Sequence, residues 1–215
     1  MTSLRDLVFI LVVVIDLFLL ASSRLGAAIR TVAIQGALLG TLPLLLLEER
    51  HSLGHALLLA GGALAIKGYL IPRLMFRAIR EASIRREMEP IVGFVPSMVL
   101  GGIGVALAFA FASRLPLPNG GLHAYLVPTA LSTVWAGLLL VVSRRKAVNQ
   151  VLGFLVLENG VYVFGLLISD FMPTMVEAGV LLDLFAAVFV MGIVMFHINR
   201  EFSSLDTEKL SALKD

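Results

Sequence analysis

Three acidic residues stand inside apolar segments that are long enough to cross a lipid bilayer. Glu158 lies in GFLVLENGVYVFGLL, Asp183 in GVLLDLFAAVFVMGIVMF, and Asp16 in LVFILVVVIDLFLLAS. An ionised carboxylate at such depth is costly, and acids within a membrane are typical of proton relays and ion pathways. The three acids therefore predict proton handling.

Glu158 is the strongest candidate. It follows Lys146 by twelve residues, which at about 1.5 Å per residue places it roughly 18 Å along a helix, close to the middle of a bilayer. Tyr162 would lie one turn further on the same face, with Asn159 adjacent to the acid. A carboxyl in this setting could exchange protons near neutral pH. The alternative is a protonated or paired carboxyl that only fixes helix packing.

The last apolar segment holds further candidates for proton transfer. Asp183 lies about nine residues into it, whereas Glu177 lies nearer its outer boundary, where water can reach the side chain. His197 stands at its cytoplasmic end, where an imidazole either exchanges protons with water or complements a helix C-terminus.

Asp16 has two possible roles that the sequence leaves open. It could extend a charge relay together with Lys67, or it could form a structural pair with Lys67 or Arg30. Lys67 precedes Arg73 by only six residues, so its long side chain could instead reach the membrane surface.

The composition indicates an integral membrane protein. Hydrophobic residues make up 59% of the 215 residues, charged residues 15%, and the mean hydropathy is +0.96, whereas soluble domains have about 25% charged residues. At about 20 residues per crossing, seven crossings fill the chain and leave no separate soluble domain. The net charge of +2 does not imply nucleic acid as a partner, because in membrane proteins the positions of the positive residues matter more than their sum.

The sequence predicts an all-α, polytopic membrane protein with seven transmembrane helices, followed by a cytoplasmic tail over 201–215. The crossings are expected within 1–200, at about 6–23, 26–47, 53–72, 91–112, 123–142, 147–168 and 174–198. With the N-terminus outside, thirteen of the seventeen lysines and arginines fall on the inner side: Arg24, Arg30, Arg73, Arg77, Arg80, Arg85, Arg86, Arg144, Arg145, Lys146, Arg200, Lys209 and Lys214. The C-terminus is then cytoplasmic.

Two local patterns predict packing and surface contacts. Gly36 and Gly40 form a GxxxG pair, which favours a close helix contact. Arg73, Arg77 and Arg80 recur at helical spacing, so the third helix is expected to continue into the cytoplasm. This stripe could hold anionic lipid headgroups or dock a cytoplasmic protein.

Several kinds of catalytic chemistry are excluded from this chain. Zero cysteines exclude thiolate zinc sites and self-contained iron-sulfur clusters. No Walker motif, GxSxG elbow or HExxH helix occurs, so the minimal machinery of a nucleotide-driven pump or a hydrolase is missing. No cofactor or metal site is expected here.

The stretches RRKAVNQVLGFLVLENGVYVFGLL and EAGVLLDLFAAVFVMGIVMFHI resemble hydrogenase-4 component E, the membrane subunit associated with group 4 hydrogenase and formate hydrogenlyase complexes. The last three predicted helices, about 123–198, also resemble the complex I K subunit and the C subunit of multisubunit sodium/proton antiporters. Glu158 matches the first of two acids in those subunits. Asp183 is our choice for the second, with Glu177 as the alternative.

The resemblance implies a non-catalytic subunit in a prokaryotic inner membrane that links electron transfer to proton or sodium movement. Its expected partners are antiporter-like subunits, other membrane-arm subunits, anionic lipids and a peripheral hydrogenase arm. The nickel-iron centre and iron-sulfur clusters would belong to those partner subunits. A freestanding ion-coupled secondary transporter and a structural adaptor between larger membrane subunits remain alternatives.

Overall fold

A computed structural model of the chain describes residues 2–45, 53–81, 90–115, 122–168 and 192. The described residues form helices and contain no β-strand, as the sequence predicts. The seventh predicted crossing, at about 174–198, lies outside the described residues apart from Gly192. The predicted tail at 201–215 lies outside them as well.

The helices of the described part match the first six predicted crossings to within a few residues at most ends. They are α1 (Thr2–Ala21), α2 (Leu25–Gly40), α3 (Leu42–Leu45), α4 (Leu53–Ala63), η1 (Leu64–Leu70), α5 (Ile71–Glu81), α6 (Phe94–Ala112), α7 (Leu122–Ser143) and α8 (Ala147–Ile168). Within the described residues, three stretches are long and apolar enough to span a membrane, namely Leu25–Leu45, Phe94–Ala112 and Tyr125–Ser143. The chain is therefore a multi-pass membrane protein.

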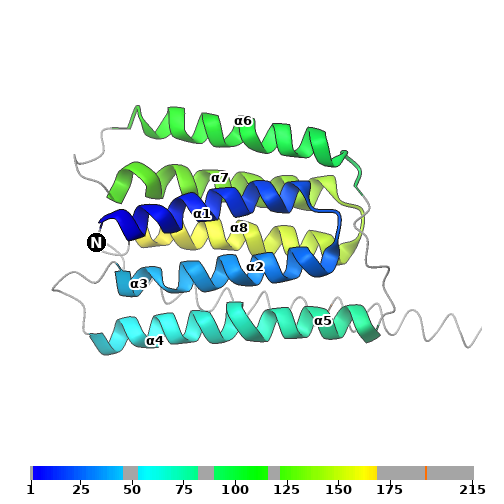
Figure 1. Cartoon of the computed structure of the whole chain (residues 1–215), viewed down its shortest axis with the longest axis horizontal. Coiled ribbons are helices and arrows are strands. Elements are labelled where there is room, and N and C mark those ends of the chain that lie inside the picture. The colour runs from blue at the N-terminus through cyan, green and yellow to red at the C-terminus, as the bar shows by residue number, and fades with distance from the viewer. Residues whose placement is uncertain (1, 46–52, 82–89, 116–121, 169–191, 193–215) are drawn as a thin grey trace, which may run out of the picture.

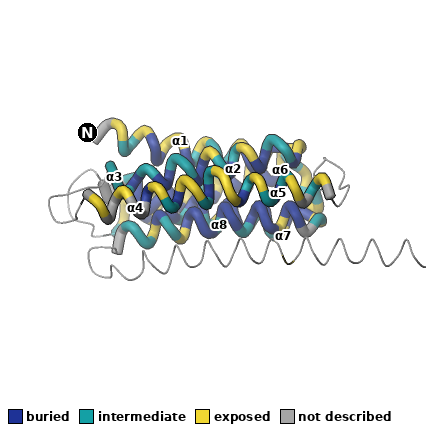
Figure 2. The backbone as a smooth tube through the Cα atoms, turned by 90° about the horizontal axis from the view of Figure 1, so that it is seen from below, coloured by how far each residue is buried: buried dark blue, intermediate teal, exposed yellow. Residues whose placement is uncertain are grey.

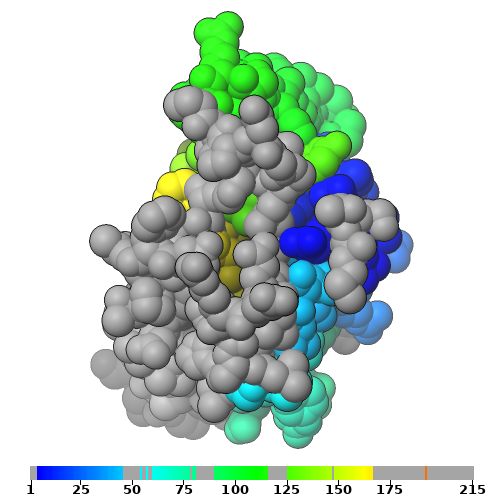
Figure 3. All heavy atoms as spheres, turned by 90° about the vertical axis from the view of Figure 1, so that its left-hand side faces the viewer, coloured from blue at the N-terminus to red at the C-terminus, as the bar shows by residue number. Residues whose placement is uncertain are grey.

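The long helices lie side by side in one bundle, and successive long helices run in opposite directions (Figure 1). The helix α6 lies at one edge and the helix formed by α4, η1 and α5 at the other, with α1, α2, α7 and α8 between them. Seen from the end where the chain begins, the same two helices mark the edges of the molecule (Figure 3). The alternation brings the arginines of α5 and the two that follow α7, Arg144 and Arg145, to the same end of the bundle.

The pair α7 and α8 forms the most buried part of the bundle (Figure 2). A Cβ atom on Gly160 would lie 2.6 Å from the backbone nitrogen of Val134, and one on Gly153 would lie 2.6 Å from that of Val141. Only glycine permits helices in a membrane to approach this closely. The two helices therefore pack backbone against backbone, which makes them a firm support for side chains on the remaining faces.

The third long helix runs without a break through α4, η1 and α5, although η1 has the wide turns of a π-helix. The predicted extension of this helix beyond residue 72 is confirmed, because α5 reaches Glu81. Arg73 and Arg80 are exposed on α5, whereas Met75 is buried against the core. The stripe of arginines is therefore the outer face of an amphipathic helix.

Arg144 closes one end of the bundle from the turn between α7 and α8. The sequence predicts it as one of several inner-side charges, but the structure buries its side chain completely. Its Nη2 donates to the carbonyl oxygen of Leu20 at 2.7 Å, its Nη1 to that of Val92 at 3.4 Å, and the guanidinium lies 4.8 Å from the ring centroid of Phe94. Burial lowers the pKa of Arg144 from its ordinary value, because desolvation disfavours the charged form. Arg144 thus caps the C-terminus of α1, where helical carbonyls lack partners within the helix.

Candidate functional site

The π-helical segment η1 presents Lys67 to the interior of the bundle. The side chain is only 7% exposed, and its Nζ donates to Oδ1 of Asn159 on α8 at 3.0 Å. Nζ also lies 4.9 Å from the centroid of the Tyr162 ring, within the range of a cation–π interaction. Lys67 therefore points inward and does not reach for the membrane surface. Segments with π-helical turns frequently occur at functional sites.

A series of side-chain hydrogen bonds continues from Asn159 to the first helix. Nδ2 of Asn159 donates to Oε1 of Gln35 at 3.2 Å, and Nε2 of Gln35 donates to Oδ1 of Asp16 at 2.7 Å. We call the four residues Lys67, Asn159, Gln35 and Asp16 the amide chain. Oγ1 of Thr133 on α7 donates to the second oxygen of Asp16 at 2.7 Å. Together these side chains connect η1, α8, α2, α1 and α7.

All four members of the amide chain are buried. A buried polar group without a hydrogen bond costs free energy, and a buried charge without compensation costs more. The amide chain avoids these costs because every link satisfies a donor and an acceptor at once. An acidic and a basic residue are thereby held within the bundle and are joined by neutral amides.

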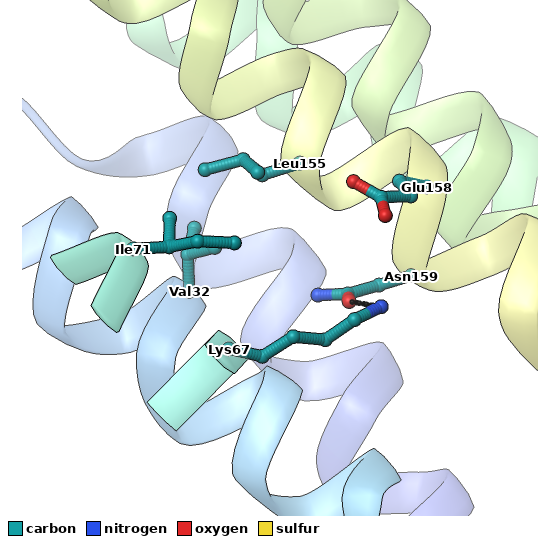
Figure 4. A pocket seen from close by; sticks show the side chains of 6 residues that line it. All are labelled: Val32, Lys67, Ile71, Leu155, Glu158 and Asn159. Atoms are coloured by element: carbon teal, nitrogen blue, oxygen red, sulfur yellow. Dashed lines mark hydrogen bonds between the residues drawn. The ribbon is translucent and has the colours of Figure 1, made fainter. Parts of the chain in front are cut away.

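Glu158 lies next to the amide chain and lines a small cavity (Figure 4). Leu155, Glu158 and Asn159 reach this cavity from α8, while Lys67 reaches it from η1. The cavity has about 10 Å³ available to the centre of a water molecule, which is roughly the space of one water. A buried acid and a buried lysine therefore share a small cavity with largely apolar walls.

The remaining walls of this cavity are formed by Val32 and Ile71. Both are aliphatic side chains, which limits the access of bulk water and strengthens electrostatic interactions within the site.

Gly36 determines how closely Lys67 can lie against α2. A Cβ atom on Gly36 would lie 2.7 Å from Cβ of Lys67, and one on Gly40 would lie 3.1 Å from Cβ of Ala63. The GxxxG pair thus forms the contact surface for the third long helix, as its spacing predicts. Gln35, the neighbour of Gly36, faces α8 instead, where its amide oxygen accepts from Asn159.

Four predicted site residues lie together in the structure. Asp16 and Lys67 belong to the amide chain, Glu158 lines its cavity, and the ring of Tyr162 faces Lys67. Arg30 is not part of this group, since it is exposed and lies over the ring of Phe76 at 5.9 Å.

Three other predicted site residues, Asp183, Glu177 and His197, lie outside the described residues. Whether they approach Glu158 stays a prediction.

Gln35 and Thr133 are site residues that the sequence does not reveal. Neither is charged, and each contacts a partner that is far away in the chain. Asn159 is noticeable only as the neighbour of Glu158. The sequence signal that could have identified Gln35 is its position in a helix made mostly of alanine, glycine and aliphatic residues. A long polar side chain in such a helix needs a hydrogen-bond partner when it is buried, as Gln35 is.

The described residues include no group of three or more histidine or acidic side chains able to hold a metal ion. The chemistry that this arrangement can support is proton exchange between Glu158 and Lys67 across their cavity, and charge interaction of Lys67 with Asp16.

Comparison with known proteins identifies two related groups. The family model described as NADH-ubiquinone/plastoquinone oxidoreductase chain 4L matches residues 123–215, which include α7 and α8. An uncharacterised protein of Mycobacterium tuberculosis, Rv0085, is 35% identical over 195 residues, covering 89% of this chain and 87% of that protein. No solved structure matches the chain.

Hydrogenase-4 component E of Escherichia coli strain K12 is 31% identical over 160 residues, covering 74% of this chain and 73% of that protein. The protein of the same name from Shigella flexneri matches to the same extent. This identity extends over most of both proteins, and the chain 4L match to the C-terminal part agrees with it. The chain belongs to the hydrogenase-4 component E family.

Proposed function

We propose that this chain is a non-catalytic membrane subunit of a hydrogenase-like, complex I-related redox complex. In this role it contributes buried charged residues to proton or sodium translocation coupled to electron transfer. The family relationship supports the type of complex. Electron transfer, with its nickel-iron centre and iron-sulfur clusters, is assigned to partner subunits in the membrane arm and the peripheral arm.

The observation that carries the proposal is the shared cavity of Glu158 and Lys67. An acid and a base that line the same small cavity can exchange a proton through one water molecule. Each also changes the proton affinity of the other, because opposite charges in a medium of low polarity stabilise one another. A change of charge in a neighbouring subunit would therefore alter both.

Asp183, Glu177 and His197 extend this proposal toward the two membrane surfaces. Asp183 would be the second exchange site after Glu158, with Glu177 as the alternative. His197 would exchange protons with the cytoplasm. Antiporter-like subunits would contact this chain within the membrane, and anionic lipid headgroups would contact the arginines of α5.

Replacing Glu158 by glutamine tests the proposal in the intact complex. The amide keeps the shape of the side chain and removes its titration. We expect redox-driven ion pumping in proteoliposomes to fall by about a hundredfold, the lower end of the range for losing a proton-transfer group, while the subunits still co-purify. Asp6→Asn is a matched control, because it makes the same chemical change near the start of α1 and outside the amide chain.

The outcomes separate three functions. Full pumping by the Glu158→Gln complex would contradict the relay and leave Glu158 with a packing role. Unchanged pumping after neutralisation of Glu158, Asp16 and Asp183 together would favour a structural adaptor. Ion-coupled transport by the purified chain alone would favour a freestanding carrier.

A further inference from the structure

The amide chain has a direction that its two ends impose. The ammonium group of Lys67 has donors only, so Asn159 must present its oxygen to Lys67, as observed at 3.0 Å. The amide nitrogen of Asn159 is then directed at Gln35 and finds its oxygen at 3.2 Å. The nitrogen of Gln35 is in turn directed at Asp16, which accepts at 2.7 Å. Each amide orientation follows from the one before it.

Asp16 completes the chain as an acceptor on both of its oxygens. Oδ1 accepts from Gln35 and Oδ2 accepts from Thr133, both at 2.7 Å. This arrangement suits a carboxylate, because hydrogen bonds from neutral donors to an ionised oxygen are stronger than those to a neutral one. A cation at one end and an anion at the other polarise the two amides in the same sense, so the bonds reinforce one another.

The two amides also set a limit on what the chain can transmit. A carboxamide has two N–H donors and a carbonyl acceptor, but it is not among the groups that take up and release protons in proteins. Protons therefore cannot pass from Lys67 to Asp16 through Asn159 and Gln35, although charge can be felt along the chain.

We infer that Gln35 and Asn159 join Asp16 and Lys67 into one amide-bridged pair of an acid and a base, in which the charge of each residue stabilises the charge of the other while no proton passes between them. Gln35 and Asn159 are positioning residues in this arrangement. The inference deepens the proposed function and rests on it for its purpose. It places Asp16 beside the ion route as a counter-charge, and leaves exchange to Lys67 and Glu158 across their cavity.

The described residues place further charged groups on the elements that pack around Lys67. Glu158 shares its cavity and the Tyr162 ring faces it from α8. On the other helices packed against η1, Arg30 of α2 lies over Phe76, and Arg73 of α5 donates to the hydroxyl of Tyr69 at 2.7 Å. Asp16 is the acid that reaches Lys67 through amides, so its influence can be tested separately.

The test uses the full chain in lipid nanodiscs with ¹⁵N-labelled lysine. The chain has four lysines, Lys67, Lys146, Lys209 and Lys214, so four side-chain nitrogen signals are expected in an NMR pH titration. Lys67→Met assigns the signal of interest. Asp16→Asn should lower the proton affinity of Lys67 by about tenfold, the order of magnitude for unit charges roughly 10 Å apart at an effective dielectric constant of about 20.

Cutting the amide chain should remove that effect. In the Gln35→Leu background, the additional Asp16→Asn change should alter the proton affinity of Lys67 by less than about twofold. Asn159→Leu cuts the chain at its other link and should give the same result, which provides a second variant if Gln35→Leu does not fold. Thr133→Val is the matched control, because it removes a hydrogen bond to Asp16 without cutting the chain, and the tenfold effect should persist.

Two results would overturn the inference. An equal effect of Asp16→Asn with and without Gln35 would mean that the charges interact through space and that the amides are only structural. No effect of Asp16→Asn in the otherwise unchanged protein would mean that the two residues are not coupled. Both readouts are obtained without redox turnover, so they are independent of the pumping result for Glu158→Gln.

Discussion

Lys67 and Arg144 are both buried cations, yet their surroundings differ in kind. Lys67 lies inside the bundle and contacts the side chains of Asn159 and Tyr162. Arg144 lies at the end of the bundle and donates to the backbone carbonyls of Leu20 and Val92. Side-chain partners can change rotamer or protonation state, whereas helix-end carbonyls are fixed by the backbone. The type of partner, more than burial itself, therefore distinguishes a charged group that can change its protonation or contacts from one that stabilises the fold.

The chemistry of the two cations matches this division. The planar guanidinium carries several donors in a fixed geometry and stays protonated, whereas the ammonium of lysine readily changes its proton affinity when buried. We therefore expect substitutions at Arg144 to affect stability first and those around Lys67 to affect ion movement first.

The largest effect on stability is expected from Arg144→Ala. The substitution removes charge-assisted hydrogen bonds to two carbonyls, which at about 1.5 kcal/mol or more each predicts a loss of about 3 kcal/mol. Unfolding of the purified chain in mixed micelles would measure it. Arg145→Ala is the control, because the neighbouring side chain is exposed. Equal stability of the two variants would contradict the structural role assigned to Arg144, because it would show that Arg144 does not stabilise the C-terminus of α1.

A smaller loss is expected from Gly36→Ala. The added methyl group would lie 2.7 Å from Cβ of Lys67, so the helices must separate, and overpacking of this kind costs about 2 kcal/mol. The displacement would also lengthen the link to Asn159, so pumping by the assembled complex should fall as well. Gly62→Ala is the matched control, because no atom lies within 4 Å of the position of its Cβ. If Gly36→Ala left both the free energy of unfolding and pumping unchanged, the contact between Gly36 and Lys67 would not be as close as the structure shows.

The smallest effect is expected from Thr133→Val, which removes a hydrogen bond to Asp16 from outside the amide chain. The change keeps the shape of the side chain and removes one hydrogen bond to Asp16, so a loss of about 1 kcal/mol in the free energy of unfolding is expected. Pumping should be largely retained, because Gln35 still holds Asp16. A loss of pumping as large as that of Glu158→Gln would show that Thr133 belongs to the ion route.

Much of the fold follows from the apolar runs of the sequence. Spans of about 20 apolar residues predict helices wherever the bilayer excludes other backbone structures, and six such helices lie near their predicted positions. The π-helical turns of η1 were not predicted, because LAIKGYL has no feature that separates it from an ordinary apolar helix. The burial of Arg144 was not predicted either, because the distribution of charges indicates a side of the membrane and not a depth.

The site was only partly predictable, for a different reason. Asp16, Lys67 and Glu158 stand out because charges are rare in apolar segments. Gln35 does not, because an uncharged amide can occur in such a helix for many reasons. Its connection to Asn159 spans 124 residues of sequence, and no local pattern carries such information.

Because η1 has the wide turns of a π-helix, the number of residues in the third long helix determines the direction in which the side chains of α5 point. Insertion or removal of one residue between Leu64 and Leu70 would rotate everything that follows about the helix axis. The arginines of α5 would then no longer face outward while Lys67 and Ala63 contact Gly36 and Gly40 of α2. A helix built in this way tolerates changes of residue type far better than changes of residue number.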